Sequence, residues 1–330
     1  MIISRSLSVL APLIASLTLL SCSAPPANES IKASVNSHSA QSTTLTKSKQ
    51  ATDPVSFNDF SSELKAQQLS LAQGFVYEGP FTPYQGSLSR IYGSTGAGCL
   101  EGSQQLKEGA QGIQIQRWAL NRDYGHPLMI QYLSDLSERT RSLGLPPLLI
   151  GDISQSLGGP YGPKSNHASH NTGIDVDLPF DFALPRKSVS ELANPQDVYI
   201  VRGSKIQKTF TKSIELYIKT AASDPRVDRI FVAPMIKKHM CRLYEGQEHN
   251  GFLHKLRPWF GHQAHMHVRL KCPFDSPECI SQMPVPQGTG CGYELESWFL
   301  PPPPKSTIAK PKVKKERILP AKCTQLLKLQ

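Results

Sequence analysis

Several patterns that would assign this sequence to a familiar chemistry are missing. The seven cysteines include no Cys-x-x-Cys pair, which argues against metal binding by these thiols. There is no His-Glu-x-x-His segment, which excludes the helix-borne zinc proteases, and no Gly-x-Ser-x-Gly elbow, which weighs against a serine hydrolase of that architecture. Ser62 and Lys65 have the spacing of penicillin-binding enzymes, but neither Ser-Asp-Asn nor Lys-Thr-Gly accompanies them, so we interpret this match as chance.

Acidic residues are missing from residues 1–21. This segment contains Arg5 and an apolar run, Leu7 to Leu20, that is too short for a comfortable membrane span. The combination predicts a secretory signal peptide.

The signal segment is followed at once by a cysteine, Cys22. The four residues ending there resemble the lipobox of bacterial lipoproteins, although Leu20 is bulkier than usual at its position. Ordinary cleavage after Ala24 is the alternative, but Pro25 follows it, and leader peptidases tolerate proline there badly. We therefore predict a lipid anchor at Cys22. Because Ser23 rather than Asp follows the cysteine, we expect a periplasmic protein anchored to the outer membrane.

Composition divides the rest of the chain. Residues 22–56 are rich in Ser, Thr, Ala, Asn and Lys, which predicts a disordered tether. Residues 57–300 form the predicted folded domain, with weak helical spacing over 57–73 and a compact body that begins near Tyr84. Both ends look non-globular, so we expect one compact domain of roughly 240 residues. Residues 301–330 are a tail whose Pro- and Lys-rich start should be extended.

Six cysteines remain when Cys22 is set aside, an even number in an exported chain, which predicts three disulfides. Cys323 lies beyond the Pro- and Lys-rich segment, so it is expected to tie the end of the chain back to the domain, with Cys99 as the favoured partner. The 36 basic and 26 acidic residues give a formal charge of +10. Outside the cytoplasm this favours anionic envelope polymers or lipid head groups over nucleic acid, unless the basic tail only aids solubility.

Periodicity predicts the elements of the folded domain. Apolar spacing and proline or glycine boundaries indicate helices over 127–144, 210–221 and 235–243, and strands over 148–150 and 229–232.

Two short stretches, 166–177 and 262–270, hold five of the ten histidines. Apolar residues alternate with Asp175 and Asp177 at the end of the first stretch, and with His265, His267 and Arg269 in the second. This is strand periodicity, so each strand can turn an apolar side to a core and its polar side to a cleft.

Imidazoles and a carboxylate on two strands suit a zinc site with three protein ligands and one open position. We predict His170, Asp177 and His267 as the ligands, with Gly173 allowing the turn from loop into strand. His265, on the same face as His267, is the predicted general base. His167 and His262 are further ligands, orienting residues or stabilisers of an oxyanion.

Other polar residues have two interpretations. Asp175 is expected to bond backbone amides or orient His170, rather than bind metal. Arg269 either binds a substrate carboxylate or pairs with an acid. The remaining histidines are expected to be structural or superficial: His38, His126, His239, His249 and His254.

The segment 169–177 together with His265-Met266-His267 resembles the LAS metallopeptidases, which include lysostaphin-type, D-Ala-D-Ala-type and sonic-hedgehog-like zinc folds. More narrowly, the segments 167–170, 257–260 and 262–270 and the cysteine spacing resemble the penicillin-insensitive murein endopeptidases. The similarity extends from about Gly86 to Cys323.

This resemblance implies an α+β fold in which helices flank an antiparallel sheet, stabilised by the disulfides Cys99–Cys323, Cys241–Cys291 and Cys272–Cys279. It implies a zinc peptidase whose metal ligands are His170, Asp177 and His267, with His167 sometimes counted among them, and whose active-site pair is His265 and His262. Relatives carry an Asp-Gly-x-His segment, proposed as a second metal site, where this chain has Arg-Gly-Ser-Lys at 202–205. The difference argues against a second zinc ion.

The implied activity is penicillin-insensitive hydrolysis of the D-alanyl–meso-diaminopimelate cross-links of peptidoglycan. Two alternatives stay open: a D,D-carboxypeptidase or dipeptidase acting on cell-wall peptides, and a non-catalytic lipoprotein that binds the wall. The sequence predicts no oligomeric state, and it leaves open whether the metal is zinc or another divalent ion.

Overall fold

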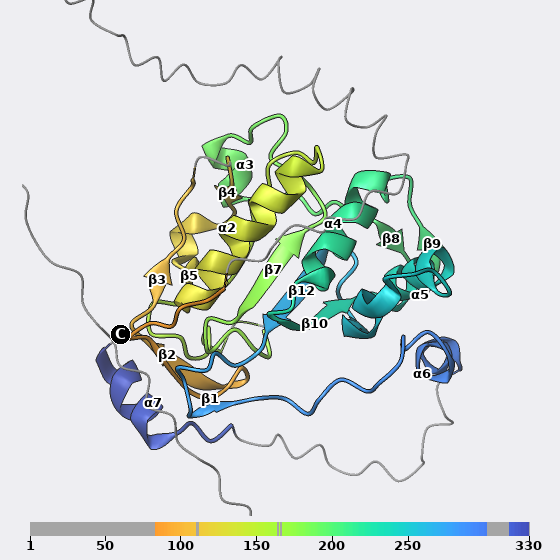
Figure 1. Cartoon of the computed structure of the whole chain (residues 1–330). Helices are drawn as coiled ribbons and strands as arrows, with labels where there is room; N and C mark the ends of the chain where they lie inside the picture. Colours follow the sequence, from red (N-terminus) through yellow and green to blue (C-terminus); the bar gives the residue numbers. More distant parts are fainter. Residues whose placement is uncertain (1–82, 110–111, 164, 166, 302–316, 330) are drawn as a thin grey trace, which may run out of the picture. The chain divides into compact units, whose positions relative to one another are not determined.

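The computed structural model describes residues 83–109, 112–163, 165, 167–301 and 317–329 (Figure 1). All of them belong to the second of two units, Pro54–Gln330. The predicted signal peptide, lipobox and tether, and the helix expected over 57–73, lie outside the described residues. Within the described ranges, no helix combines the length and the apolar character needed to cross a membrane.

The central sheet has four strands in the order β11, β10, β12, β7, with bounds Leu256–Pro258, Val227–Val232, His265–Leu270 and Asp175–Pro179. β12 pairs antiparallel with both β10 and β7. β11 runs parallel to β10, so the sheet is mixed, and the prediction of an antiparallel sheet is wrong at this edge. The reason is the crossover between β10 and β11 through the helix α5, Pro234–Tyr244, because a connection of that kind returns the chain in the same direction.

Three longer helices confirm the sequence periodicity: α2, Pro127–Ser142, α4, Lys212–Ser223, and α5. α2 begins with Pro127 in its first turn, after His126 has capped the backbone N–H of Leu128. It ends two residues before Gly144, whose φ of +74° is the left-handed conformation common just past a helix.

The main core lies between these helices and one side of the central sheet (Figure 1). Val176, Val268 and Ile230 occupy paired positions on β7, β12 and β10, and all three are fully buried. Met129 and Leu133 of α2 belong to the same cluster, together with Ile214, Tyr217 and Ile218 of α4. Because side chains alternate along a strand, this apolar packing turns the polar residues of β7 and β12 to the other side of the sheet.

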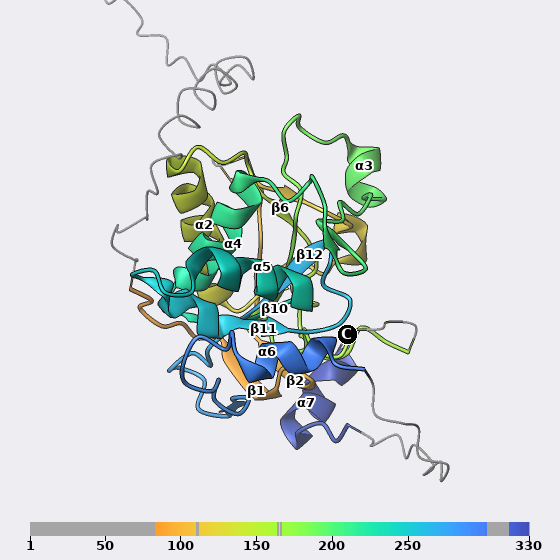
Figure 2. The ribbon, with the colours of Figure 1, turned by 90° about the vertical axis from the view of Figure 1, so that its right-hand side faces the viewer.

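A second sheet pairs β1, Arg90–Ser94, antiparallel with β2, Ala97–Glu101, and parallel with β13, Cys279–Ile280. The terminal helix α7, Ala321–Leu326, packs against β2 (Figure 2), where Cys323 forms its disulfide with Cys99. The other expected pairs, Cys241–Cys291 and Cys272–Cys279, are also present. The α+β class and the disulfides are therefore confirmed.

The remaining elements are short. They are β3 Gln104–Gln105, β4 Gln114–Ile115, η1 Trp118–Leu120, β5 Tyr124–Gly125, β6 Leu149–Ile150, α3 Val189–Ala193, β8 Val201–Arg202, β9 Lys205–Ile206, η2 Asn250–Lys255, α6 Tyr293–Glu296, η3 Ser297–Phe299 and η4 Leu327–Leu329.

Candidate metal centre

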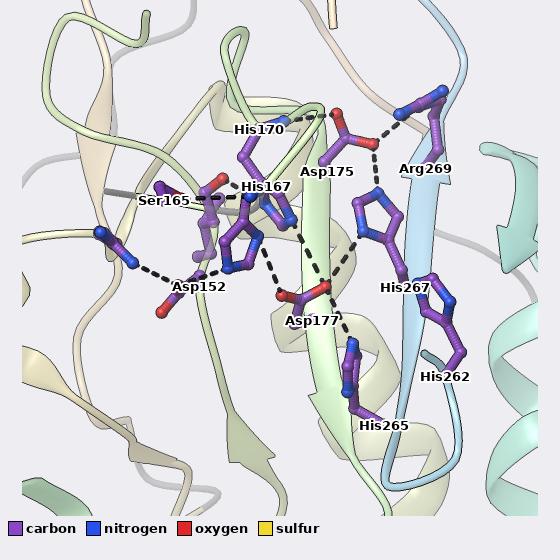
Figure 3. A network of polar contacts seen from close by, with 12 residues as sticks. Asp152, Ser165, His167, His170, Asp175, Asp177, His262, His265, His267 and Arg269 are labelled. Atoms are coloured by element: carbon purple, nitrogen blue, oxygen red, sulfur yellow. Dashed lines mark hydrogen bonds and ion pairs between the residues drawn. The ribbon is translucent and has the colours of Figure 1, made fainter. Parts of the chain in front are cut away.

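The polar side of β7 and β12 carries the acidic and histidine side chains of the candidate site. In the register of the two strands, His267 lies opposite Asp177 and Arg269 lies opposite Asp175. Their alternation with buried apolar residues confirms the strand prediction for both stretches. Figure 3 shows the imidazoles of His265 and His267 on the same side as the Asp177 carboxylate.

The loop before β7 adds two more imidazoles. Gly173 has a φ of +67°, and a Cβ there would lie 2.5 Å from Leu100, so only glycine fits this turn into the strand. His170 has a φ of +73°, which is unusual for a residue with a side chain and is found mainly where a site requires it. Its Nδ1 lies 2.9 Å from the carbonyl oxygen of Ile153, so Nδ1–H donates there and the Nε2 lone pair is left for another partner.

His167, His170 and Asp177 each offer a ligand atom, and these atoms all lie within 4.8 Å of one another. Nε2 of His170 is 3.4 Å from Oδ1 of Asp177. Both atoms are buried, and neither makes a contact with hydrogen-bond geometry among the described residues, although Nδ1 of His267 lies close to Oδ1 of Asp177. Buried polar atoms are normally paired, so these two fit a metal ion as their missing partner.

His267 lies between the two aspartates. Its Nδ1 is 3.1 Å from Oδ1 of Asp177, and its Nε2 is 2.8 Å from Oδ1 of Asp175. Burial disfavours the charged imidazole, but Asp175 and Asp177 outweigh it and raise the pKa of His267 to about 9. The three predicted histidine ligands therefore lie around Asp177, the fourth: His167 and His170 form the tight donor group with it, and His267 lies beside them.

Neighbouring charges also determine the pKa values of Asp175 and Asp177. Both are buried, which opposes their ionisation. For Asp177 the imidazoles of His170 and His265 outweigh burial and hold the pKa well below its ordinary value. For Asp175, Arg269 and His267 lower the pKa in the same way. Both groups are thus carboxylates at neutral pH, as metal binding and hydrogen-bond acceptance require.

His265, the predicted base, has its Nε2 3.8 Å from Oδ1 of Asp177 and a side chain that is 32% exposed. Burial of its ring lowers its pKa, so it is neutral at pH 7 and able to accept a proton. His262 lies farther out, with its ring centre 5.1 Å from that of His265. Burial, with the charges of His265 and His267, lowers the pKa of His262 to about 4.

Arg269 resolves one of the open interpretations. Its Nε donates to Oδ1 of Asp175 at 2.7 Å and its Nη1 donates to Gln282 at 2.6 Å. Asp175 also accepts from the backbone N–H of His170 at 3.3 Å, as expected from the sequence. Arg269 is thus paired with an acid, the second of its two interpretations.

Two residues at the site were not predicted. Asp152 follows the buried strand β6, and its Oδ2 lies 3.5 Å from Nε2 of His167. The ring of Tyr161 lies 5.3 Å from that of His167 and 5.7 Å from that of His170. The only sequence signal for Asp152 was its position just after a buried strand. The only signal for Tyr161 was its closeness in sequence to His167 and His170.

Two cavities meet at this centre, and both are lined by His167, Asp177 and His265. The arginine-lined cavity has a volume of about 350 Å³ and includes Arg117 and Arg122. The aromatic-lined cavity has a volume of about 510 Å³ and includes Phe231, Trp259, Phe260 and His262. The candidate metal centre therefore has open space on two sides.

The sequence is similar to those of known proteins that share one name. A family model described as penicillin-insensitive murein endopeptidase matches residues 91–328. Proteins with that name are 40% identical in Haemophilus influenzae, 43% in Yersinia pestis and 42% in Escherichia coli O157:H7. These alignments cover 75%, 74% and 74% of this chain and 85%, 87% and 88% of the relatives. The chain belongs to the penicillin-insensitive murein endopeptidase family of peptidases.

Proposed function

We propose that the protein is a zinc-dependent endopeptidase that hydrolyses the D-alanyl–meso-diaminopimelate cross-links of peptidoglycan. The observation that carries the proposal is the group formed by His167, His170 and Asp177, whose buried His170 Nε2 and Asp177 Oδ1 make no contact with hydrogen-bond geometry among the described residues. Membership of a murein endopeptidase family supports the choice of substrate. We also propose that the fold is of the LAS type.

His170, Asp177 and His267 would hold the metal, with His167 as a further ligand. A zinc ion bound there supplies Lewis acidity, which activates water and stabilises negative charge on the carbonyl oxygen. His265 is neutral at pH 7, so it takes a proton from the attacking water and passes it to the amide nitrogen that leaves. His262 is the second member of the proposed active-site pair, with its ring centre 5.1 Å from that of His265.

This mechanism involves no acylated side chain. The six cysteines in the described part of the chain are all in disulfides, so none of them can serve as a thiol nucleophile. Because water attacks the amide directly, there is no serine for a β-lactam to acylate. The proposed activity is therefore insensitive to penicillin.

The experiment that tests this function is digestion of purified cross-linked peptidoglycan by the full-length protein, with products identified by mass. We expect muropeptide dimers to become intact monomers, with activity abolished by a chelator, restored by zinc and unaffected by penicillin. Loss of terminal alanine alone would assign a D,D-carboxypeptidase instead. Binding of the wall without any cleavage by the zinc-loaded protein would assign a wall-binding lipoprotein.

We further propose that the protein acts in the periplasm, anchored to the outer membrane through a lipid on Cys22. This rests on the sequence of residues 1–23, which lie outside the described part of the chain. Labelling of cells with a radioactive fatty acid should mark the wild-type protein and not a Cys22→Ser variant. Equal labelling of the two proteins would refute the anchor.

A further inference from the structure

The arginine-lined cavity contains two guanidinium groups for one buried carboxylate. Nη1 of Arg122 donates to Oδ2 of Asp152 at 2.9 Å, and Nε of Arg117 lies 3.4 Å from Oδ1 of the same residue. Asp152 is only 2% exposed, and the Arg122 guanidinium stacks 4.0 Å above the ring of Tyr161. Both arginines therefore share Asp152 as their one buried acidic partner.

No ion pair joins Arg117 or Arg122 to the other described acids that line this cavity. Asp177 belongs to the candidate metal centre with His167 and His170, and Asp181 is paired with Lys187 at 3.0 Å. Asp197 is exposed and accepts a hydrogen bond from the Tyr199 hydroxyl at 3.3 Å. The cavity thus combines an arginine pair with one exposed acid.

The backbone of Arg117 is held in an unusual conformation. Its φ of 51° and ψ of 32° are in the left-handed region, which residues other than glycine rarely adopt. The Arg117 N–H donates to the carbonyl of Leu192, and its side chain is 33% exposed. Strain of this kind is retained mainly where a side chain must be aimed at a site. Arg117 is therefore positioned by the fold and accessible to a ligand.

We propose that Arg117 and Arg122 form a binding site for a carboxylate on the residue that leaves after cleavage. This inference rests on the proposed function. Hydrolysis adds water across the amide, so the alanyl carbonyl becomes a carboxylate and the diaminopimelate nitrogen becomes an ammonium group. The carbon that bears this nitrogen also bears a carboxylate, which a guanidinium recognises through paired, charge-assisted hydrogen bonds. Asp197, the exposed acid of the same cavity, would pair with the new ammonium group.

The aromatic-lined cavity does not offer an equivalent site. Arg269 is the only arginine or lysine among its described lining residues; it is largely buried, and its Nε and Nη1 already donate to Asp175 and Gln282. The leaving residue therefore belongs in the arginine-lined cavity and the alanyl side of the substrate in the other. It follows that the enzyme distinguishes a diaminopimelate cross-link from one made to a lysine side chain, whose ε-carbon carries no carboxylate.

The test compares two synthetic cross-linked peptide dimers that differ at one group. One contains the D-alanyl–meso-diaminopimelate bond with the neighbouring carboxylate free, and the other has that carboxylate converted to a carboxamide. We expect kcat/KM of the zinc-loaded full-length protein to be at least about tenfold higher for the free carboxylate. Arg117→Gln should lower kcat/KM about tenfold on the carboxylate dimer and leave the carboxamide dimer unaffected.

Two further variants and the metal content separate recognition from general damage. Arg117→Lys keeps the charge and should retain part of the preference, and Arg141→Gln, an exposed arginine at the end of α2, should leave it unchanged. Zinc content should be the same in all the proteins. Equal cleavage of the two dimers by the wild type, or an equal loss on both in Arg117→Gln, would overturn the carboxylate site alone. Failure of the wild type to cleave either dimer would overturn the proposed function, and the inference with it.

Discussion

Nε2 of His267 donates to Oδ1 of Asp175 at 2.8 Å, and this hydrogen bond decides which ring nitrogen of His267 faces the candidate metal centre. With Nε2 engaged, Nδ1 lies 3.1 Å from Oδ1 of Asp177. A carboxylate behind a histidine ligand fixes the tautomer and makes the ring a better donor to metal. Asp175 is therefore expected to act on the metal through His267 rather than as a ligand.

Replacing Asp175 with Asn should weaken zinc binding about 10- to 100-fold, because the amide cannot accept and orient His267 as the carboxylate does. Competition with a chromogenic chelator measures the affinity. Asp228→Asn is a suitable control, since Asp228 is on β10 and contacts its neighbour Arg229. Unchanged zinc affinity in Asp175→Asn would show that His267 is not held by this hydrogen bond for metal binding.

The roles of His265 and His170 can be separated by measuring metal content beside activity. His265→Ala should lower kcat about 10²- to 10⁴-fold and keep the zinc, because it removes the proton acceptor alone. His170→Ala should lose zinc and activity together, because it removes a buried donor atom of the metal group. His239→Ala, at a partly buried position away from the centre, should change neither quantity. Loss of zinc in His265→Ala would make that residue a ligand instead of a base.

Local periodicity explains why much of the site could be predicted from the sequence. The alternation of Asp175 and Asp177 with apolar neighbours fixes the face of β7 without knowledge of its partners. The same holds for His265, His267 and Arg269 on β12. Once the apolar sides of two such strands enter one core, their polar sides must lie together.

Features that depend on contacts between distant segments were not predictable in this way. Asp152 reaches His167 because its segment is hydrogen-bonded to β7: the N–H of Gly151 donates to the carbonyl of Asp177 and the N–H of Asp177 donates to the carbonyl of Asp152. The sequence does not indicate this pairing. The parallel edge strand β11 likewise depends on the crossover through α5. No sequence pattern indicated the position of Arg117. Its backbone is left-handed, and its N–H donates to the carbonyl of Leu192, which is distant in sequence.

Breaking the Cys99–Cys323 disulfide should destabilise the protein more than breaking Cys272–Cys279. The first joins residues 224 positions apart and the second residues only 7 apart. In the chain-entropy model the losses are about 5 and about 2 kcal/mol respectively. Urea unfolding of the double variants Cys99→Ser/Cys323→Ser and Cys272→Ser/Cys279→Ser measures the difference. Equal losses would mean that strain or local packing, rather than loop closure, dominates.

His126, a buried histidine that is not a predicted metal ligand, should make the stability of the protein depend on pH. His126 is fully buried, and its Nδ1 accepts the N–H of Leu128 at 3.2 Å, which requires an unprotonated nitrogen. Burial lowers its pKa from 6.5 to about 4, against the opposing charge of Asp275, which lies 3.6 Å from Nε2, while Arg90 lowers it further.

Between about pH 6.5 and pH 4 the unfolded chain binds a proton at His126 that the folded protein does not. The unfolded state then holds more protons, so the free energy of unfolding decreases as the pH falls through this range, by on the order of 3 kcal/mol from this group. His126→Asn keeps a helix-capping side chain but cannot titrate, so its free energy of unfolding should fall less steeply with acid. The exposed His249→Asn is the control and should follow the wild type. Parallel curves for the wild type and His126→Asn, measured by denaturation across this pH range, would show that His126 is protonated in the folded protein.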